Sequence, residues 1–245
     1  MISIREFARE CLAVDRASFS IGRQVLGYAH RMPRRRVSVL DRIEPMQETA
    51  FNLSAILVGH ERGYTGLITQ RMAERASHAI DVMREIYAQH NIGIKRIYWS
   101  RIPEAEIRER NHVVINSSDE ARALADWWST DNNGIDVFFV NSVVDAAGWS
   151  AEQGSPGVCD KDDTSRFSGA VVELSNGDDI TGVVLAHEVG HFLGLKHFGD
   201  IANVMGIERR ENVGDINVNS RDMTEEQAEI ISSHCMILSP CNHEH

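Results

Sequence analysis

Hydrophobic and polar residues follow one another along the chain with spacings that predict both helices and strands. From Thr65 to about His90, apolar residues recur every three or four positions, which is the spacing of an amphipathic helix. Asn91 and Gly93 follow directly and supply a helix stop. The apolar positions of this predicted helix are Leu67, Ile68, Met72, Ala76, Ala79, Ile80, Met83, Ile86 and Tyr87.

Shorter apolar runs indicate strands between further helices. Ile94–Trp99 is rich in β-forming residues, and Ile135–Val140 has the length and composition of a buried strand. Ala121–Trp128 is typical of a helix, and Gly169–Leu174 indicates another strand. Residues 145–169 are rich in Gly, Ser, Asp and Pro and predict a long loop. This alternation favours a mixed α/β layer structure.

Two more helices are predicted in the second half of the chain. Ile180–Leu193 is apolar enough for a buried helix, and Asp178 or Asp179 is its candidate N-cap. Met223–Ile237 predicts a last helix with Thr224 as N-cap and an acidic or amide side chain close behind it.

The buried helix carries the residues with the clearest chemistry. His187 and His191 lie four residues apart, so both imidazoles project from one helix face about one turn apart and can bind one Zn²⁺. Glu188 lies beside them, offset by about 100°, where a carboxylate can take a proton from a water molecule. Gly194 can end the helix and turn the chain back, which lets His197 approach the same ion as a third ligand.

The segment HEVGHFLGLKH resembles the HExxHxxGxxH motif of the metzincin clan of zinc endopeptidases, most closely pappalysin-like and other bacterial metzincins. The clan has a methionine turn downstream of the third histidine, and the resemblance makes Met205, in Asn203-Val204-Met205-Gly206, its counterpart here. Phe198 and Ile207 differ from the residues that mark well-known families of the clan.

The resemblance also implies a fold. It is an α/β (α+β) zincin fold with a twisted mixed sheet, an antiparallel edge strand along the cleft, an active-site helix and a small C-terminal subdomain with a helix. The upper subdomain would end near residue 194, and residues 195–245 would form the lower one. The edge strand, which would pair with an extended substrate, would consist of Gly169, Ala170, Val171, Val172, Glu173 and Leu174.

We expect a zinc-dependent endopeptidase that hydrolyses peptide bonds of protein or peptide substrates. One Zn²⁺ held by His187, His191 and His197 would activate a water molecule, with Glu188 as general base. Two alternatives stay open: a catalytically silent zinc-containing binding module, and a protease toxin or effector with a single target. Glu188 argues against the binding module, because a scaffold that only binds has no need of a base.

Composition and charge narrow the class of protein further. The chain has 245 residues and a net charge of −11, which disfavours a general nucleic-acid binder because such a protein needs a cationic face. No apolar run approaches the roughly 20 residues that a transmembrane helix needs. We expect a monomer whose partner is a protein or peptide substrate.

The charge is uneven along the chain. Residues 1–50 hold nine arginines and six acidic residues, a balance of +3, which leaves −14 for residues 51–245. Charged residues interrupt the stretch that a Sec signal peptide would need, so the location stays open between the cytoplasm and export by a non-Sec route. We interpret residues 1–60 as a basic N-terminal extension and residues 61–245 as the catalytic domain.

The remaining candidate residues give weaker signals. Cys11, Cys159, Cys235 and Cys241 have no zinc-knuckle or CxxC spacing and could form two disulfides or stay reduced. His234, close to the C-terminus, lacks ligand spacing. A loop with three carboxylates suits Ca²⁺, although we favour a solvated acidic loop; these residues are Asp160, Asp162 and Asp163.

Overall fold

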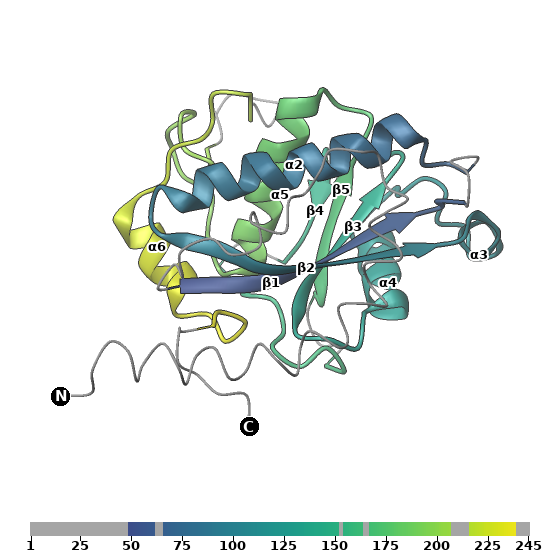
Figure 1. Cartoon of the computed structure of the whole chain (residues 1–245), viewed down its shortest axis with the longest axis horizontal. Coiled ribbons are helices and arrows are strands. Elements are labelled where there is room, and N and C mark those ends of the chain that lie inside the picture. Colours follow the sequence, from purple (N-terminus) through teal and green to yellow (C-terminus); the bar gives the residue numbers. More distant parts are fainter. Residues whose placement is uncertain (1–48, 62–65, 152–153, 164–166, 207–215, 239–245) are drawn as a thin grey trace, which may run out of the picture.

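A computed structural model describes residues 49–61, 66–151, 154–163, 167–206 and 216–238 (Figure 1). Within these residues, five strands form one sheet and five helices pack around it. The strands are β1 (Thr49–Val58), β2 (Ile92–Ile102), β3 (Gly134–Val140), β4 (Gly148–Trp149) and β5 (Gly169–Glu173). The helices are α2 (Gln70–Ala88), α3 (Glu104–Glu109), α4 (Ser118–Trp128), α5 (Asp178–Phe192) and α6 (Glu225–Ser232).

The sheet is mixed, which confirms the predicted α/β class. Its strand order is β2-β1-β3-β5-β4, with β1 parallel to both β2 and β3. β3 and β5 are also parallel, whereas β4 runs antiparallel to β5 at the sheet edge. Every residue of β3 and β5 is buried, as expected of parallel strands covered on both faces.

The prediction that Gly169–Leu174 forms the antiparallel edge strand is wrong. These residues contribute β5, an interior strand that pairs with β3 on one side and with β4 on the other. The edge strand is β4, which lies inside the segment 145–169 predicted as a loop. A strand of two residues, Gly148 and Trp149, is too short to show any alternation of apolar and polar positions.

The predicted domain boundary at residue 60 is also wrong, because Thr49–Val58 lies inside the sheet between β2 and β3. Its apolar pattern is interrupted by Asn52 and Ser54, which are buried and hydrogen-bonded to Asn133 and Asn132 at 2.7 Å each. The domain that carries the three histidines therefore includes β1. The basic cluster around Arg34 and the thiol of Cys11 lie outside the described residues.

Two hydrophobic layers cover the two faces of the sheet. α2 and α5 pack on one face, and α3 and α4 pack on the other (Figure 1). Gly182 lets α5 approach α2 closely, since a Cβ there would lie 2.4 Å from the Cβ of Val82. The Tyr87 hydroxyl donates to the Ala186 carbonyl at 2.8 Å, and burial raises the pKa of Tyr87. These contacts hold α5, the helix with the histidines, rigidly against the rest of the core.

Helix termini differ from the predictions by a few residues. α5 is capped by Gly177, while Asp178 and Asp179 lie in its first turn and pair with Arg75 and His78 of α2. Carboxylates there still favour the helix, because its N-terminus carries a partial positive charge. Among the described residues, no helix is both long and apolar enough to cross a bilayer.

Candidate metal centre

The three predicted ligands come together at the C-terminal half of α5. The Nε2 atom of His191 lies 3.0 Å from Nε2 of His187 and 3.1 Å from Nε2 of His197. His187 and His191 are buried, whereas His197, beyond the helix, is partly exposed. The arrangement is a compact cluster of three imidazole nitrogens that can hold a metal ion.

The hydrogen bonds of the other ring nitrogens fix the tautomers of two ligands. Nδ1 of His187 donates to the Val204 carbonyl at 2.8 Å, and Nδ1 of His191 donates to the Leu195 carbonyl at 2.9 Å. Each Nε2 then keeps a lone pair directed at the cluster centre. A backbone carbonyl opposite the metal-binding nitrogen is the arrangement that metal-ligating histidines normally have.

Electrostatics keep the rings neutral, as metal ligation requires. Burial and the neighbouring His191 lower the pKa of His187 to about 3, and burial lowers that of His191 to about 4. Burial also lowers the pKa of His197. Three lone pairs facing one another repel unless a cation lies between them, and the ligand nitrogens of a tetrahedral zinc site are about 3.3 Å apart. The residues therefore fit Zn²⁺.

Gly194 places the third ligand by ending the helix, as the sequence predicts. Its φ of +101° lies in the region that favours glycine. The Leu195 amide donates to the Gly190 carbonyl and the Gly194 amide donates to the His191 carbonyl, both at 2.9 Å, which is the Schellman pattern. The chain then reverses and brings His197 back to the cluster.

Glu188 lies beside the histidines but outside their cluster. It is buried, and desolvation raises the pKa of its carboxyl to about 8. Its side chain packs against Gly148 of the edge strand, where a Cβ would lie 2.7 Å from Cγ of Glu188 and 2.8 Å from the Val171 carbonyl oxygen. Gly148 therefore leaves room for the carboxylate, a role that sequence reasoning missed because a glycine in a loop gives no chemical signal.

Met205 packs directly against the ligand helix. It is fully buried, and its sulfur lies where a Cβ on Gly190 would be 2.7 Å away. The Asn203 side-chain oxygen accepts a hydrogen bond from the Met205 amide at 2.9 Å, and the Met205 carbonyl accepts one from Phe198 at 2.8 Å. The segment is thus a tight turn next to the three histidines.

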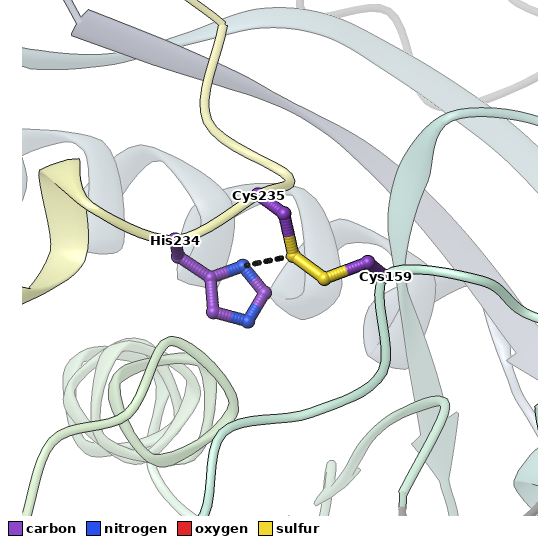
Figure 2. Close-up of side chains that lie close together, drawn as sticks. All are labelled: Cys159, His234 and Cys235. Atoms are coloured by element: carbon purple, nitrogen blue, oxygen red, sulfur yellow. Dashed lines mark hydrogen bonds between the residues drawn. A yellow bond between two sulfur atoms is a disulfide. The ribbon is translucent and has the colours of Figure 1, made fainter.

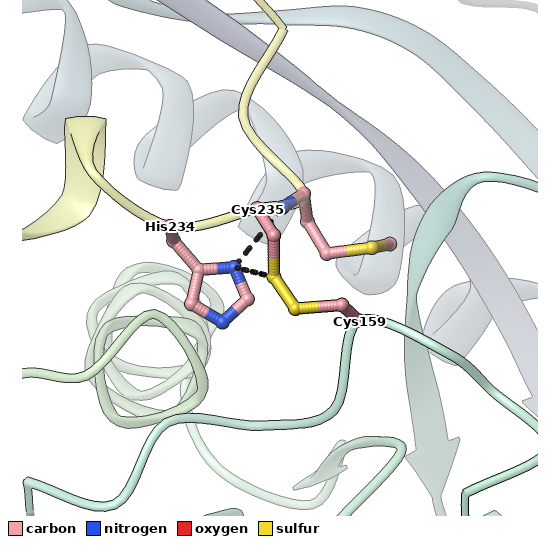
Figure 3. The surroundings of a disulfide bond; sticks show 4 residues. Cys159, His234 and Cys235 are labelled. Carbon is pink, nitrogen blue, oxygen red and sulfur yellow. Dashed lines mark hydrogen bonds between the residues drawn. A yellow bond between two sulfur atoms is a disulfide. The ribbon is translucent and has the colours of Figure 1, made fainter. Parts of the chain in front are cut away.

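A second cluster joins a loop to the C-terminal segment near the same helix. Cys159 and Cys235 form a disulfide with a Cα–Cα distance of 5.9 Å, and His234 lies beside it (Figure 2). Nδ1 of His234 is 3.8 Å from the Cys235 sulfur and accepts the Met236 amide at 3.2 Å (Figure 3). The two cysteines are 76 residues apart, so their spacing could not show the pairing. Cys11 and Cys241 lie outside the described residues.

This disulfide links parts of the chain that pack on the end of α5. Phe192, the last residue of α5, packs against Gly157 and against the His234 ring, with 5.5 Å between the two ring centroids. The Gly157 amide also donates to the Phe192 carbonyl at 2.8 Å. The bridge therefore encloses the whole histidine cluster in one covalent loop and holds the turn that follows α5.

Replacing both cysteines, as Cys159→Ser with Cys235→Ser, is expected to lower the free energy of unfolding by about 4 kcal/mol, because the open loop regains its conformational entropy. Urea unfolding of the two proteins without reductant measures the difference. The wild type treated with a thiol reductant should approach the double variant, and equal midpoints for all three samples would contradict the expectation.

The predicted calcium loop does not form a ligand cluster among the described residues. The Asp160 carboxylate instead accepts the amide of Asp162 at 3.0 Å, a local turn. Lys161 of the same loop reaches inward and pairs with the buried Asp136 at 2.8 Å. Calcium binding stays a prediction, and the loop has an evident structural role.

Comparisons with known proteins found structural neighbours. No known protein family matches the chain by sequence, and no curated protein is significantly similar to it. Among solved structures, archaemetzincin from Methanopyrus kandleri is 15% identical with a TM-score of 0.46, over 77% of this chain and 96% of that one. Metalloproteinase-II from Bacteroides fragilis is 12% identical with a TM-score of 0.46, over 77% of this chain and 54% of that one. This chain thus spans about half the length of the second neighbour.

Proposed function

We propose that this protein is a zinc-dependent endopeptidase that hydrolyses peptide bonds of protein substrates. The observation that carries the proposal is the convergence of three imidazole nitrogens, with Nε2 of His187 and of His197 both within 3.1 Å of His191 Nε2, next to a buried carboxylate outside this cluster. Metal ligands alone would suit a structural site, but three ligands leave a fourth position open, and this is typical of catalytic zinc.

The residues that would hold the ion are His187, His191 and His197. Zinc bound there supplies a Lewis acid for the scissile carbonyl and lowers the pKa of the attacking water. The Val204 and Leu195 carbonyls hold the first two rings in the tautomer that presents Nε2. Met205 and its turn pack against α5 and support the ligand set as its methionine turn.

Glu188 acts as general base and then as general acid. It takes a proton from the attacking water and delivers it to the leaving amine. Burial favours proton uptake, because it raises the pKa of this carboxyl, and a cation close by offsets part of that shift. Gly148 keeps the space that the side chain occupies.

The edge strand β4 is the proposed substrate-binding strand, in place of the segment 169–174. It forms the antiparallel end of the sheet, and its Gly148 lies directly against Glu188. An extended peptide that adds to the outer edge of β4 through main-chain hydrogen bonds would pass next to the catalytic carboxylate.

We also propose that the enzyme works as a monomer in an oxidising compartment. The Cys159–Cys235 disulfide supports the oxidising compartment, because such bonds persist outside the reducing cytoplasm. Mass analysis of the protein recovered from its native compartment would test location, oxidation state and mature N-terminus together.

Removal of the metal tests the proposed function. Purified protein is expected to contain one equivalent of zinc and to cleave casein or a peptide library. A chelator should abolish cleavage, and added Zn²⁺ should restore it. One bound zinc without cleavage of any substrate would favour the silent binding module, and cleavage of a single protein in a proteome-wide profile would favour the single-target protease.

A further inference from the structure

We propose that Gln227 of α6 is a positioning residue of the metal centre, acting through Asn203 on the ligand His187. The proposal rests on the proposed zinc site. Neither residue is one of the three proposed ligands, and the sequence pattern gives them only a turn and a helix cap. Their importance follows from a chain of hydrogen bonds that leads from α6 to the first ligand.

The first link is a reciprocal pair of side-chain amides. Nε2 of Gln227 donates to Oδ1 of Asn203 at 3.0 Å, and Nδ2 of Asn203 donates to Oε1 of Gln227 at 2.9 Å. Both side chains are buried, at 7% and 3% exposure for Gln227 and Asn203. A buried amide pair with both bonds made is rigid, since breaking it leaves two polar groups unsatisfied.

The second link fixes the peptide that faces the ligand. Oδ1 of Asn203 also accepts a hydrogen bond from the Met205 amide at 2.9 Å, so it holds the peptide bond that joins Val204 to Met205. The Val204 amide donates to the Asp222 carbonyl at 2.7 Å. The Val204 carbonyl, held in this way, accepts Nδ1 of His187 at 2.8 Å. The orientation of the His187 ring thus depends on the Asn203 turn.

The third observation separates this role from helix capping. Gln227 also completes the capping box of α6. Its Oε1 accepts a hydrogen bond from the Thr224 backbone amide at 2.9 Å, and its own backbone amide donates to the Thr224 hydroxyl at 3.2 Å. Glutamate fills this position of a capping box as well as glutamine does. Only the bond to Oδ1 of Asn203 requires the amide, because a carboxylate has no hydrogen to donate.

Gln227→Glu therefore keeps the cap but loses the donor to Asn203. We expect its zinc dissociation constant, measured by competition with a chromophoric chelator, to rise about five- to tenfold, at or below the range for partners that contact the ligands directly. Gln70→Glu makes the same substitution at an exposed position in the first turn of α2. It should change the zinc dissociation constant by less than about twofold.

Two further variants keep the test decisive if a buried glutamate prevents folding. Gln227→Met removes the amide pair and one bond of the cap, whereas Thr224→Ala weakens the same cap and leaves the amide pair in place. We expect only Gln227→Met to lower zinc affinity, although both should lower the metal-free midpoint of unfolding.

Equal zinc affinity in Gln227→Glu and the wild type, or an equal loss in Thr224→Ala and Gln227→Met, would overturn the positioning role. Failure of the wild type itself to bind zinc would overturn the proposed function and this inference with it. The test measures zinc affinity and not cleavage. If the wild type binds zinc but cleaves no substrate, the zinc affinities of the variants still test the positioning role of Gln227.

Discussion

Glu188→Gln is expected to lower the rate of peptide hydrolysis by about 10²- to 10⁴-fold, the usual contribution of a positioned general base. Glutamine has nearly the same shape and can occupy the space against Gly148, but it cannot take up the proton of the attacking water. Zinc content should stay at one equivalent, because Glu188 is not in the cluster of His187, His191 and His197. Steady-state kinetics measure the rate of hydrolysis, and metal analysis of the same sample measures the zinc content.

The matched control is Glu74→Gln, the same change at an exposed position of α2. It should keep wild-type activity and zinc content. Loss of zinc in Glu188→Gln would indicate that the carboxylate is a ligand, and activity within about tenfold of the wild type would contradict its role as general base. Thermal unfolding should show no destabilisation, because the substitution replaces a buried ionisable group by a neutral one.

The histidine cluster was predictable because its spacing follows helix geometry. His187 and His191 lie one turn apart on any helix, and Gly194 in a left-handed conformation is the ordinary way to end one. These rules are local and need no knowledge of the rest of the fold. The helices α2, α4, α5 and α6 and the strands β2, β3 and β5 were found for the same reason, with errors of a few residues at their ends.

The strands β1 and β4 were misjudged because their signals are not local. β1 contains two polar residues, Asn52 and Ser54, which are tolerated inside only because Asn133 and Asn132, far along the chain, meet their side chains. β4 has two residues, and only the position of β5 beside it makes it a strand. Order within a sheet depends on tertiary packing, which residue spacing does not encode.

The groups that orient the histidines and Glu188 could not be predicted from the sequence, for a related reason. The partners of His187 and His191 are backbone carbonyls, which every residue has. Gly148 matters because it has no side chain, and Gln227 matters through a donor that a capping position does not need. The ligand set can therefore be identified from residue types, while the groups that orient it are identified only in three dimensions.

His191→Ala is expected to weaken zinc binding by about two orders of magnitude. A structural zinc site of four ligands contributes about 10–16 kcal/mol, so one ligand is worth about 3 kcal/mol. His191 is the most consequential choice, since its Nε2 lies within 3.1 Å of Nε2 in both other ligands. Competition with a chelator measures the loss, and peptide hydrolysis should fall with zinc occupancy.

The control is His78→Ala, which removes a partly exposed histidine that pairs with Asp179 at the start of the same helix. Its zinc affinity should stay that of the wild type, because an exposed ion pair contributes little. Unfolding provides a second, independent readout. Zinc stabilises a protein that binds it only when folded, so the wild-type midpoint should rise with added Zn²⁺, and the His191→Ala midpoint should rise less at the same zinc concentration. Equal zinc-dependent shifts in the two proteins would place the ion elsewhere, since the cluster centred on His191 could then not be the site that holds it.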